Sequence, residues 1–220
     1  MSVNLENRYL YLCTPIRPDF EQFLSNCIKG GVDIVQLRDK TADAKQIIKY
    51  SHKAIEICNE FGVPFILNDR PDIALEVKAD GVHLGQDDVP VSLARKILGP
   101  EAIIGLSTHS EKELRASLYQ QTDYISVGPL EPTPTKPGRA GTGVEYLKQA
   151  SQISKVPFFV TGAVQPKKIR NLVSLGAKGF VVVRWITESE NPFEASKQIR
   201  KEIDTQLQAK RIDGPATPKE

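Results

Sequence analysis

Cations and carboxylates occur together in short clusters of this 220-residue chain, in a combination that could hold a phosphorylated ligand. Arg38, Lys40 and Lys136 can bind phosphate, and Asp69 and Asp88 are carboxylates that follow short apolar runs. Mg2+ usually takes one or two carboxylates together with phosphate oxygens and water. These residue types therefore indicate a site for Mg2+ and a diphosphate.

Other polar residues could complete such a site. Ser107 could add hydrogen bonds to a diphosphate, and Asn68 could read the polar edge of an organic ring. His109 is expected to face the same site, whereas His52 is expected on a helix surface and His83 in core packing. The sequence offers no convincing pair of a nucleophile and a base.

Each cluster also has a purely structural interpretation, which is favoured when the cluster is taken alone. NDRP at 68–71 fits a helix cap followed by proline in the first turn, and GQDD at 85–88 fits a turn before a helix. TPTKP at 133–137 fits a stiff solvated loop. GRAGTG at 138–143 matches neither glycine-rich nucleotide motif and is interpreted as a mobile active-site loop. A functional site is favoured because these signals coincide.

The elements that must position these residues alternate between strands and helices. Apolar runs rich in Val, Ile, Leu and Phe predict buried parallel strands at 9–13, 33–39, 64–69, 81–86, 102–108, 124–130, 157–163 and 179–183. Helical spacing predicts helices from about 19, and at 43–61, 91–98, 111–120, 144–154, 166–175 and 192–206. Eight such units in order predict an α/β fold, a single-domain (β/α)8 TIM barrel over 1–207, with a disordered tail at 208–220.

A barrel explains why the polar clusters are so far apart in the sequence. Every cluster falls at the carboxyl end of a predicted strand, and these ends form the active face of a (β/α)8 barrel. Residues spread over a hundred positions are therefore expected to converge on one cleft.

Composition excludes several other classes of function. Lys plus Arg exceed Asp plus Glu by only 29 to 27, a balance that gives no argument for a nucleic acid or membrane partner. Glu6 and Arg8 interrupt the N-terminal segment where an export signal would be apolar. Cys13, Cys27 and Cys58 are too widely spaced for a metal motif and predict reduced, mostly buried thiols in a cytoplasmic protein. A homo-oligomer is possible, and the sequence leaves the oligomeric state open.

The motifs QLRDK, ND, GQDD, GLSTHS, TPTKPGR and a glycine after the seventh strand occur in an order that resembles the thiamine-phosphate synthase family, over residues 9–199. The resemblance implies condensation of 4-amino-5-hydroxymethyl-2-methylpyrimidine diphosphate with 4-methyl-5-(2-phosphooxyethyl)thiazole, which releases diphosphate. It implies that Mg2+ is held by Asp69 and Asp88. It implies a pyrimidine diphosphate site formed by Gln36, Leu37, Arg38, Asp39, Lys40, Asn68, Ser107 and Lys136, and a thiazole phosphate site formed by Thr133, Pro134, Thr135, Gly162, Val183 and Arg184.

The implied chemistry needs charge stabilisation more than proton transfer. The carbon–oxygen bond breaks first, the aminopyrimidine stabilises the resulting cation, and a thiazole nitrogen without a proton then attacks. Arg38, Lys40, Ser107 and Lys136 are therefore expected to act on the leaving diphosphate.

Two residues depart from the resemblance, and two other functions stay open. The family usually has a second glycine where this chain has Ala163, and often a serine where it has Arg184. We expect Arg184 to supply a charged contact to the thiazole phosphate, with a surface ion pair as the alternative. One alternative function is a thiazole tautomerase that uses His109 as its acid–base residue, and another is a barrel that only senses thiazole phosphate.

Overall fold

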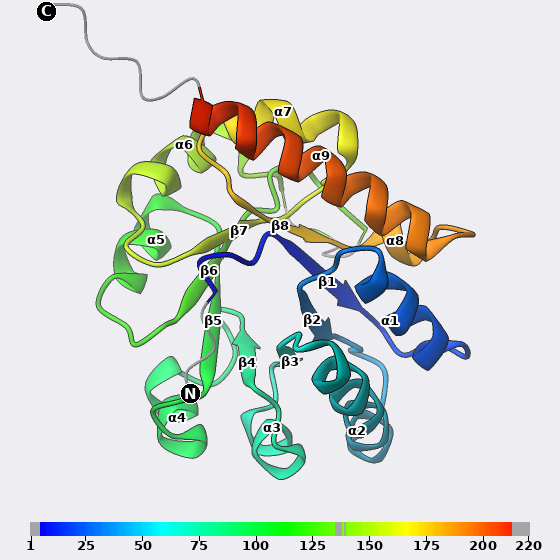
Figure 1. Cartoon of the computed structure of the whole chain (residues 1–220). Helices are drawn as coiled ribbons and strands as arrows, with labels where there is room; N and C mark the ends of the chain where they lie inside the picture. The colour runs from blue at the N-terminus through cyan, green and yellow to red at the C-terminus, as the bar shows by residue number, and fades with distance from the viewer. Residues whose placement is uncertain (1–4, 135–137, 139, 213–220) are drawn as a thin grey trace, which may run out of the picture.

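Eight parallel strands close into a barrel in chain order in the computed structural model, which describes residues 5–134, 138 and 140–212 (Figure 1). The strands are β1 (Leu10–Thr14), β2 (Ile34–Leu37), β3 (Phe65–Asn68), β4 (Gly81–Leu84), β5 (Ile103–Thr108), β6 (Tyr124–Val127), β7 (Phe158–Val160) and β8 (Gly179–Val182). The barrel closes because β1 pairs with both β2 and β8. The predicted (β/α)8 barrel is confirmed, with strands shorter than expected at several ends.

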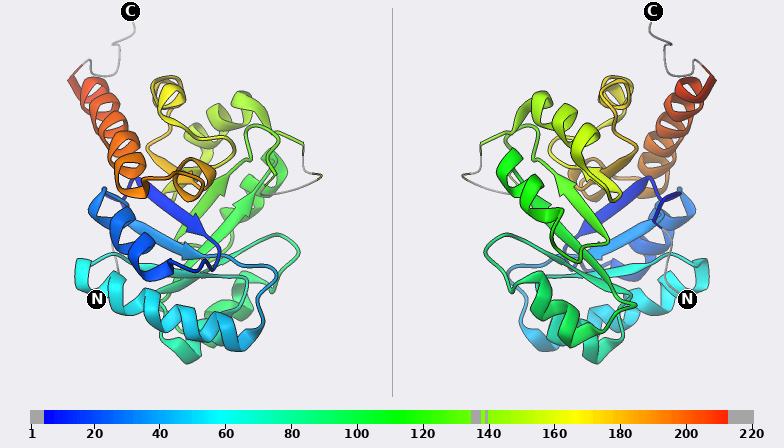
Figure 2. Two further views of the ribbon diagram at one scale, coloured as in Figure 1. Left: turned by 90° about the vertical axis from the view of Figure 1, so that its right-hand side faces the viewer. Right: turned by 90° about the vertical axis from the view of Figure 1, so that its left-hand side faces the viewer.

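Helices cover the outside of this barrel, and α9 lies beside α1 and α7 (Figure 2). They are α1 (Phe20–Lys29), α2 (Ala44–Phe61), α3 (Pro71–Val77), α4 (Val91–Leu98), α5 (Glu111–Ser117), α6 (Gly143–Ile153), α7 (Pro166–Ser174), α8 (Arg184–Thr187) and α9 (Pro192–Ile212). Local signals explain several ends: the Asp43 side chain caps α2, and Gly62 ends that helix at a φ of 64°. Pro166 and Pro192 begin their helices, as predicted.

Strand side chains divide between two layers of core. One set faces outward and packs beneath the helices, with Leu12, Val35 and Val82 fully buried. The other set fills the barrel interior and comprises Tyr11, Ile34, Ile66, Ile103, Tyr124 and Phe159, joined by Leu5 from the segment before β1. A filled interior is expected for a small barrel, and it confines any ligand to the end above this layer.

The helices also show where local patterns were insufficient. α3 and α8 were not among the predicted helices, although the cap-and-proline interpretation of 68–71 is consistent with a helix that starts at Pro71. α9 extends to Ile212, five residues beyond the predicted domain end at 207. Tertiary contact accounts for the extension, because Lys210 Nζ donates to the Val173 carbonyl on α7 at 2.7 Å.

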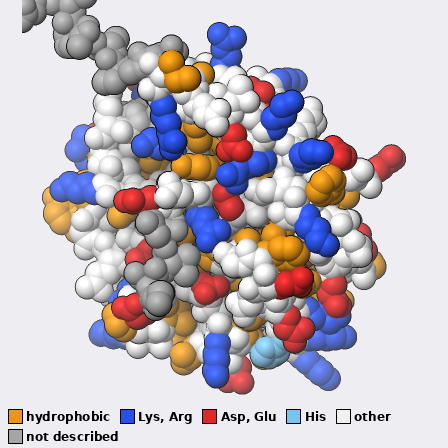
Figure 3. Space-filling view, viewed as in Figure 1, with side chains coloured by type: hydrophobic (Ala, Val, Ile, Leu, Met, Phe, Trp, Pro, Cys, Tyr) orange, Lys and Arg blue, Asp and Glu red, His pale blue; other side chains and the backbone are white. Residues whose placement is uncertain are grey.

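The surface and the cysteines agree with the composition. Lys and Arg side chains are interspersed with Asp and Glu over the face shown in Figure 3, without a large patch of one sign. The three cysteines are buried and unbridged, as predicted. Within the described part of the chain, no helix combines the length and the apolar character needed to cross a membrane.

Candidate active site

A cavity of about 320 Å3 lies above the filled interior, at the carboxyl ends of the strands. Its walls bring together most of the residues expected at one site: Gln36, Arg38, Lys40, Asn68, Asp69, Asp88, Ser107, His109 and Val183. These residues follow or end β2, β3, β4, β5 and β8. The barrel therefore assembles the predicted cluster, and we call this cavity the cleft.

Two carboxylates and a cation stand close together in the cleft. Lys40 forms an ion pair with Asp69, and the Asp88 carboxyl group lies next to Asp69. Burial raises the pKa of the Asp69 carboxyl; the Lys40 ammonium opposes that shift and the Asp88 carboxylate adds to it. The described residues contain no group of three or more acidic, His or Cys side chains suited to a metal. Two crowded carboxylates suit Mg2+, which can take its other ligands from phosphate and water.

The backbone around these carboxylates is unusual. Asp69 has a φ of 62°, in the left-handed region, and its N–H donates to the His83 carbonyl at 2.8 Å. Asp and Asn tolerate this conformation better than most residues. Asp88 Oδ2 accepts from the Gly85 N–H at 2.7 Å, which holds the turn after β4 against the cleft.

Polar side chains in the barrel interior form the floor of the cleft. Gln36 Nε2 donates to the Tyr11 hydroxyl at 2.6 Å, and the Tyr11 and Tyr124 hydroxyls are 2.8 Å apart. His83 joins this chain at both ring nitrogens, 2.9 Å from the Tyr124 hydroxyl and 2.9 Å from Ser107 Oγ. The floor thus links Gln36 on one side of the cleft to Ser107 on the other.

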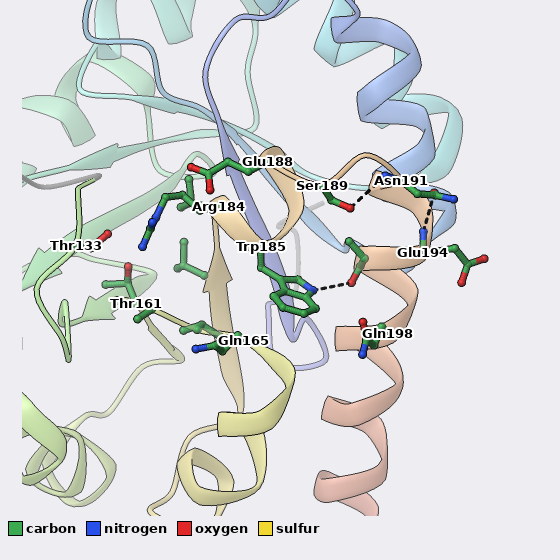
Figure 4. A pocket seen from close by; sticks show the side chains of 16 residues that line it. Thr133, Thr161, Gln165, Arg184, Trp185, Glu188, Ser189, Asn191, Glu194 and Gln198 are labelled. Carbon is green, nitrogen blue, oxygen red and sulfur yellow. Dashed lines mark hydrogen bonds between the residues drawn. The ribbon is translucent and has the colours of Figure 1, made fainter.

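A second cavity of about 750 Å3 adjoins the cleft and shares Thr161, Val181 and Val183 with it. Figure 4 shows that Thr133, Thr161 and Arg184 lie on one side of it, with the Arg184 side chain extending toward the two threonines. Two mixed polar and apolar cavities that share a wall can hold two ligands next to each other.

Backbone geometry at the second cavity depends on Gly162 and Ala163. Gly162 has a φ of 98°, and a Cβ there would come within 2.5 Å of the Leu130 nitrogen, so only glycine fits. Ala163 has a φ of 54°, a left-handed conformation that costs energy for a residue with a Cβ.

Comparison with known proteins bears directly on this arrangement. The chain matches the family model for thiamine monophosphate synthase over residues 10–186. It is 39% identical over 203 residues to the thiamine-phosphate synthase of Acidothermus cellulolyticus, covering 90% of this chain and 96% of that protein. The chain belongs to the thiamine monophosphate synthase family.

Two further relatives agree with this assignment. The thiamine-phosphate synthase of Nostoc punctiforme is 42% identical over 183 residues, which cover 83% of this chain and 52% of that protein, so the chain spans about half its length. The solved thiamine phosphate pyrophosphorylase from Pyrococcus furiosus is 28% identical, with a TM-score of 0.85, 93% of this chain covered and 100% of that one. The resemblance noted in the motifs is therefore confirmed over most of the chain.

Several predicted site residues of this family member lie outside the cleft. The Leu37 side chain is buried in the outer core beneath the helices, which leaves only its backbone for a ligand. Asp39 does not line the cleft, because its carboxylate is engaged by the loop around it. Gly162 and Thr133 line the second cavity, Pro134 lines neither cavity, and Thr135 and Lys136 are outside the described residues.

Sequence reasoning missed three residues of the floor. His83 is buried in the interior, as expected, but it also lines the cleft together with Tyr11, and Tyr124 completes the same hydrogen-bond chain. The available signal was the alternation of side chains along a strand. His83 lies two residues after Gly81, as Asn68 lies two residues after Ile66, and in each pair both residues face the same side of their strand. Gly105 leaves space for the Tyr124 ring in this floor, because a Cβ at Gly105 would lie 2.0 Å from that ring.

Proposed function

We propose that this chain is a thiamine-phosphate synthase that joins 4-amino-5-hydroxymethyl-2-methylpyrimidine diphosphate to 4-methyl-5-(2-phosphooxyethyl)thiazole and releases diphosphate. Family membership supports the activity, and the single observation that carries the chemistry is the grouping of Arg38, Lys40, Asp69 and Asp88 in one cleft. Cations beside two carboxylates suit a metal-bound diphosphate.

In this proposal the cleft holds the pyrimidine diphosphate. The floor of Gln36, Tyr11 and His83 would lie beneath the heterocycle with Ser107 at its rim, and Asn68 would bond to the polar edge of the ring. Arg38 and Lys40 would face the diphosphate, and Lys136, by its place in the motif, would do the same. Asp69 and Asp88 would hold Mg2+, which supplies positive charge to the leaving group.

The second cavity would hold the thiazole phosphate. The loops after β7 and β8 of such barrels commonly bind phosphate, partly through backbone N–H groups. Arg184 reaches into this cavity toward Thr133 and Thr161 and would add a charged contact. The shared wall at Thr161, Val181 and Val183 would let the two rings meet.

Bond formation then requires alignment and exclusion of water more than acid–base groups. The attacking ring nitrogen carries no proton, so no base is needed at that atom. Preorganised cations stabilise the charge that develops on the leaving diphosphate, and the cavities align the reactants.

The decisive experiment mixes the purified chain with both substrates and Mg2+ and assays thiamine phosphate and diphosphate. We expect stoichiometric formation of the two products, and no turnover after EDTA treatment until Mg2+ is restored. Undiminished turnover in metal-free buffer would refute the role given to Asp69 and Asp88, and absence of product would refute the activity.

Arg184→Ala tests the second cavity. We expect the KM for thiazole phosphate to rise about tenfold or more, as for the loss of a charged hydrogen bond, with the KM for pyrimidine diphosphate nearly unchanged. Equal changes in both constants would show that Arg184 does not bind the phosphate.

His109→Ala separates this proposal from a tautomerase. His109 lines the cleft, and its Nδ1 lies 2.9 Å from Glu113 Oε2, as an acid–base residue could be oriented. We expect condensation to survive the substitution. Complete loss of condensation with an unchanged melting curve would favour a proton-transfer role.

A further inference from the structure

Asp39 lies between two phosphate-binding cations but turns its carboxylate away from the cleft. Arg38 and Lys40 both line the cleft, and Asp39 does not. A negative charge this close to both cations opposes the binding of a diphosphate. Its presence therefore needs a reason other than contact with the ligand.

Hydrogen bonds show what the carboxylate does. Oδ1 accepts from the Thr41 N–H at 2.9 Å, from the Thr41 hydroxyl at 2.7 Å and from the Ala42 N–H at 3.1 Å. These three bonds close a turn over residues 39–42, which contains Lys40. Oδ2 accepts from the Ile16 N–H at 3.2 Å, and Ile16 belongs to the loop that follows β1.

The three donors on Oδ1 use its full acceptor capacity, and the Ile16 N–H takes one of the two sites on Oδ2. Burial alone would raise the pKa of Asp39, but the hydrogen bonds from Thr41, Ala42 and Ile16 outweigh it and lower the pKa. The carboxylate is thus ionised, and both of its oxygens are bonded to the loops around it.

The same bonds join two loops at the active face. Arg38 N–H donates to the Thr14 carbonyl at 2.8 Å, just before the point where Asp39 accepts from Ile16. The loop after β2 is therefore held on one side by the end of β1 and on the other by its own turn. Both contacts flank the segment that presents Arg38 and Lys40.

We infer that Asp39 is a positioning residue that holds loop 38–42 in the shape needed to present Arg38 and Lys40 to the diphosphate. This inference rests on the proposed function. It gives Asp39 the role of maintaining the loop conformation, with no direct contact to the ligand.

Asp39→Ala is the principal test, with Asp80→Ala as the matched control. Asp80 Oδ2 also accepts a backbone N–H, from Phe65 at 2.7 Å, but at the other end of the barrel. Three quantities are measured for each variant: the KM for each substrate, the melting temperature, and the Kd for inorganic diphosphate with Mg2+ by titration calorimetry.

For Asp39→Ala we expect the KM for pyrimidine diphosphate and the Kd for diphosphate to rise about tenfold, with the KM for thiazole phosphate within about twofold. Asp80→Ala should lower the melting temperature without changing either KM. Asp39→Asn should fall between wild type and Asp39→Ala, because one oxygen can still accept from Thr41 and Ala42 while the amide nitrogen cannot accept from Ile16.

Three outcomes would overturn the inference. Asp39→Ala could keep the wild-type KM and Kd values, it could change the KM values of both substrates equally, or Asp80→Ala could show the same selective rise in the KM for pyrimidine diphosphate. Failure of the proposed function is recognised separately, because the wild-type protein would then form no thiamine phosphate. The calorimetric Kd for diphosphate still tests the loop in that case.

Discussion

The carboxylates at the two ends of the barrel are used differently. At the amino ends of the strands, Asp33, Asp80 and Asp123 directly precede β2, β4 and β6. Each accepts a backbone N–H at the start of the preceding strand: Leu10 at 2.9 Å, Phe65 at 2.7 Å and Ile104 at 2.7 Å. At the carboxyl ends, Asp69 and Asp88 crowd each other beside Lys40.

The difference concerns what each carboxylate contacts. At the amino ends, each carboxylate bonds to an N–H of a neighbouring strand and stabilises the register of the two strands, whereas Asp88 accepts from the Gly85 N–H in its own turn. Asp69 instead keeps an unfavourable neighbour in Asp88, an arrangement that a bound cation would relieve. Asp39 shows that location alone does not decide the role, because it lies at the active face yet is bonded like the aspartates at the opposite end.

Asp69→Asn should produce the largest effect. We expect kcat to fall about 100-fold, because charge stabilisation of the leaving group is lost, while the melting temperature stays within a few degrees. Asn is chosen because it tolerates the left-handed backbone at this position. Steady-state kinetics and thermal melting measure the two effects, and full activity with intact Mg2+ dependence would remove Asp69 from the proposed metal site.

Asp33→Ala should have the opposite effect, lowering the stability of the fold while leaving the kinetics unchanged. Asp33 is buried, accepts from Tyr9 and Leu10, and pairs with Arg200 at 2.7 Å. Its loss should lower the free energy of unfolding by about 3 kcal/mol, since Arg200 and two N–H groups lose their acceptor. Urea denaturation measures this change, and kcat and both KM values should stay at wild-type levels. A large kinetic defect in folded protein would contradict the division between the two ends.

Asp123→Ala should also lower the free energy of unfolding without changing the kinetic constants, but by a smaller amount. Asp123 accepts from Ile104 and pairs with Arg95 at 2.7 Å, but its side chain is 42% exposed, against 12% for Asp33. Water can replace part of what is lost, so we expect a decrease of about 1 kcal/mol in unfolding free energy. A loss of unfolding free energy equal to that of Asp33→Ala would show that burial of the carboxylate does not determine the size of the effect.

Ala163→Gly should have the smallest effect of these four substitutions, and it is the one expected to raise the free energy of unfolding. Removing the Cβ relieves the left-handed strain, partly offset by the greater freedom of glycine in the unfolded chain, for a net stabilisation of about 0.5 kcal/mol. The comparison is Gly162→Ala, which we expect to be destabilising because its Cβ would meet Leu130 and Pro129. A destabilised Ala163→Gly variant would mean that the alanine side chain makes a favourable contact that outweighs its strain.

The sequence by itself determined the order of the strands and of every helix except α3 and α8, the closed barrel, and the placing of Arg38, Lys40, Asp69 and Asp88 at strand ends. These features depend on patterns within short stretches, such as apolar runs and the cap at Asp43, and on the rule that strand ends of a barrel converge. Family motifs carried the same conclusion over most of the chain.

Tertiary structure alone decided which side chains face the cleft and which acceptors are already engaged. His83 lines the cleft because strand pairing turns it inward, and Asp39 is held away from the cleft by an N–H of Ile16, a residue 23 positions away. The positive φ of Ala163 and the one-turn helix α8 likewise lack a sufficient local signal. The physical reason is common to all of these: hydrogen-bond donors, packing partners and backbone constraints come from segments that are distant in the chain and adjacent only in the folded barrel.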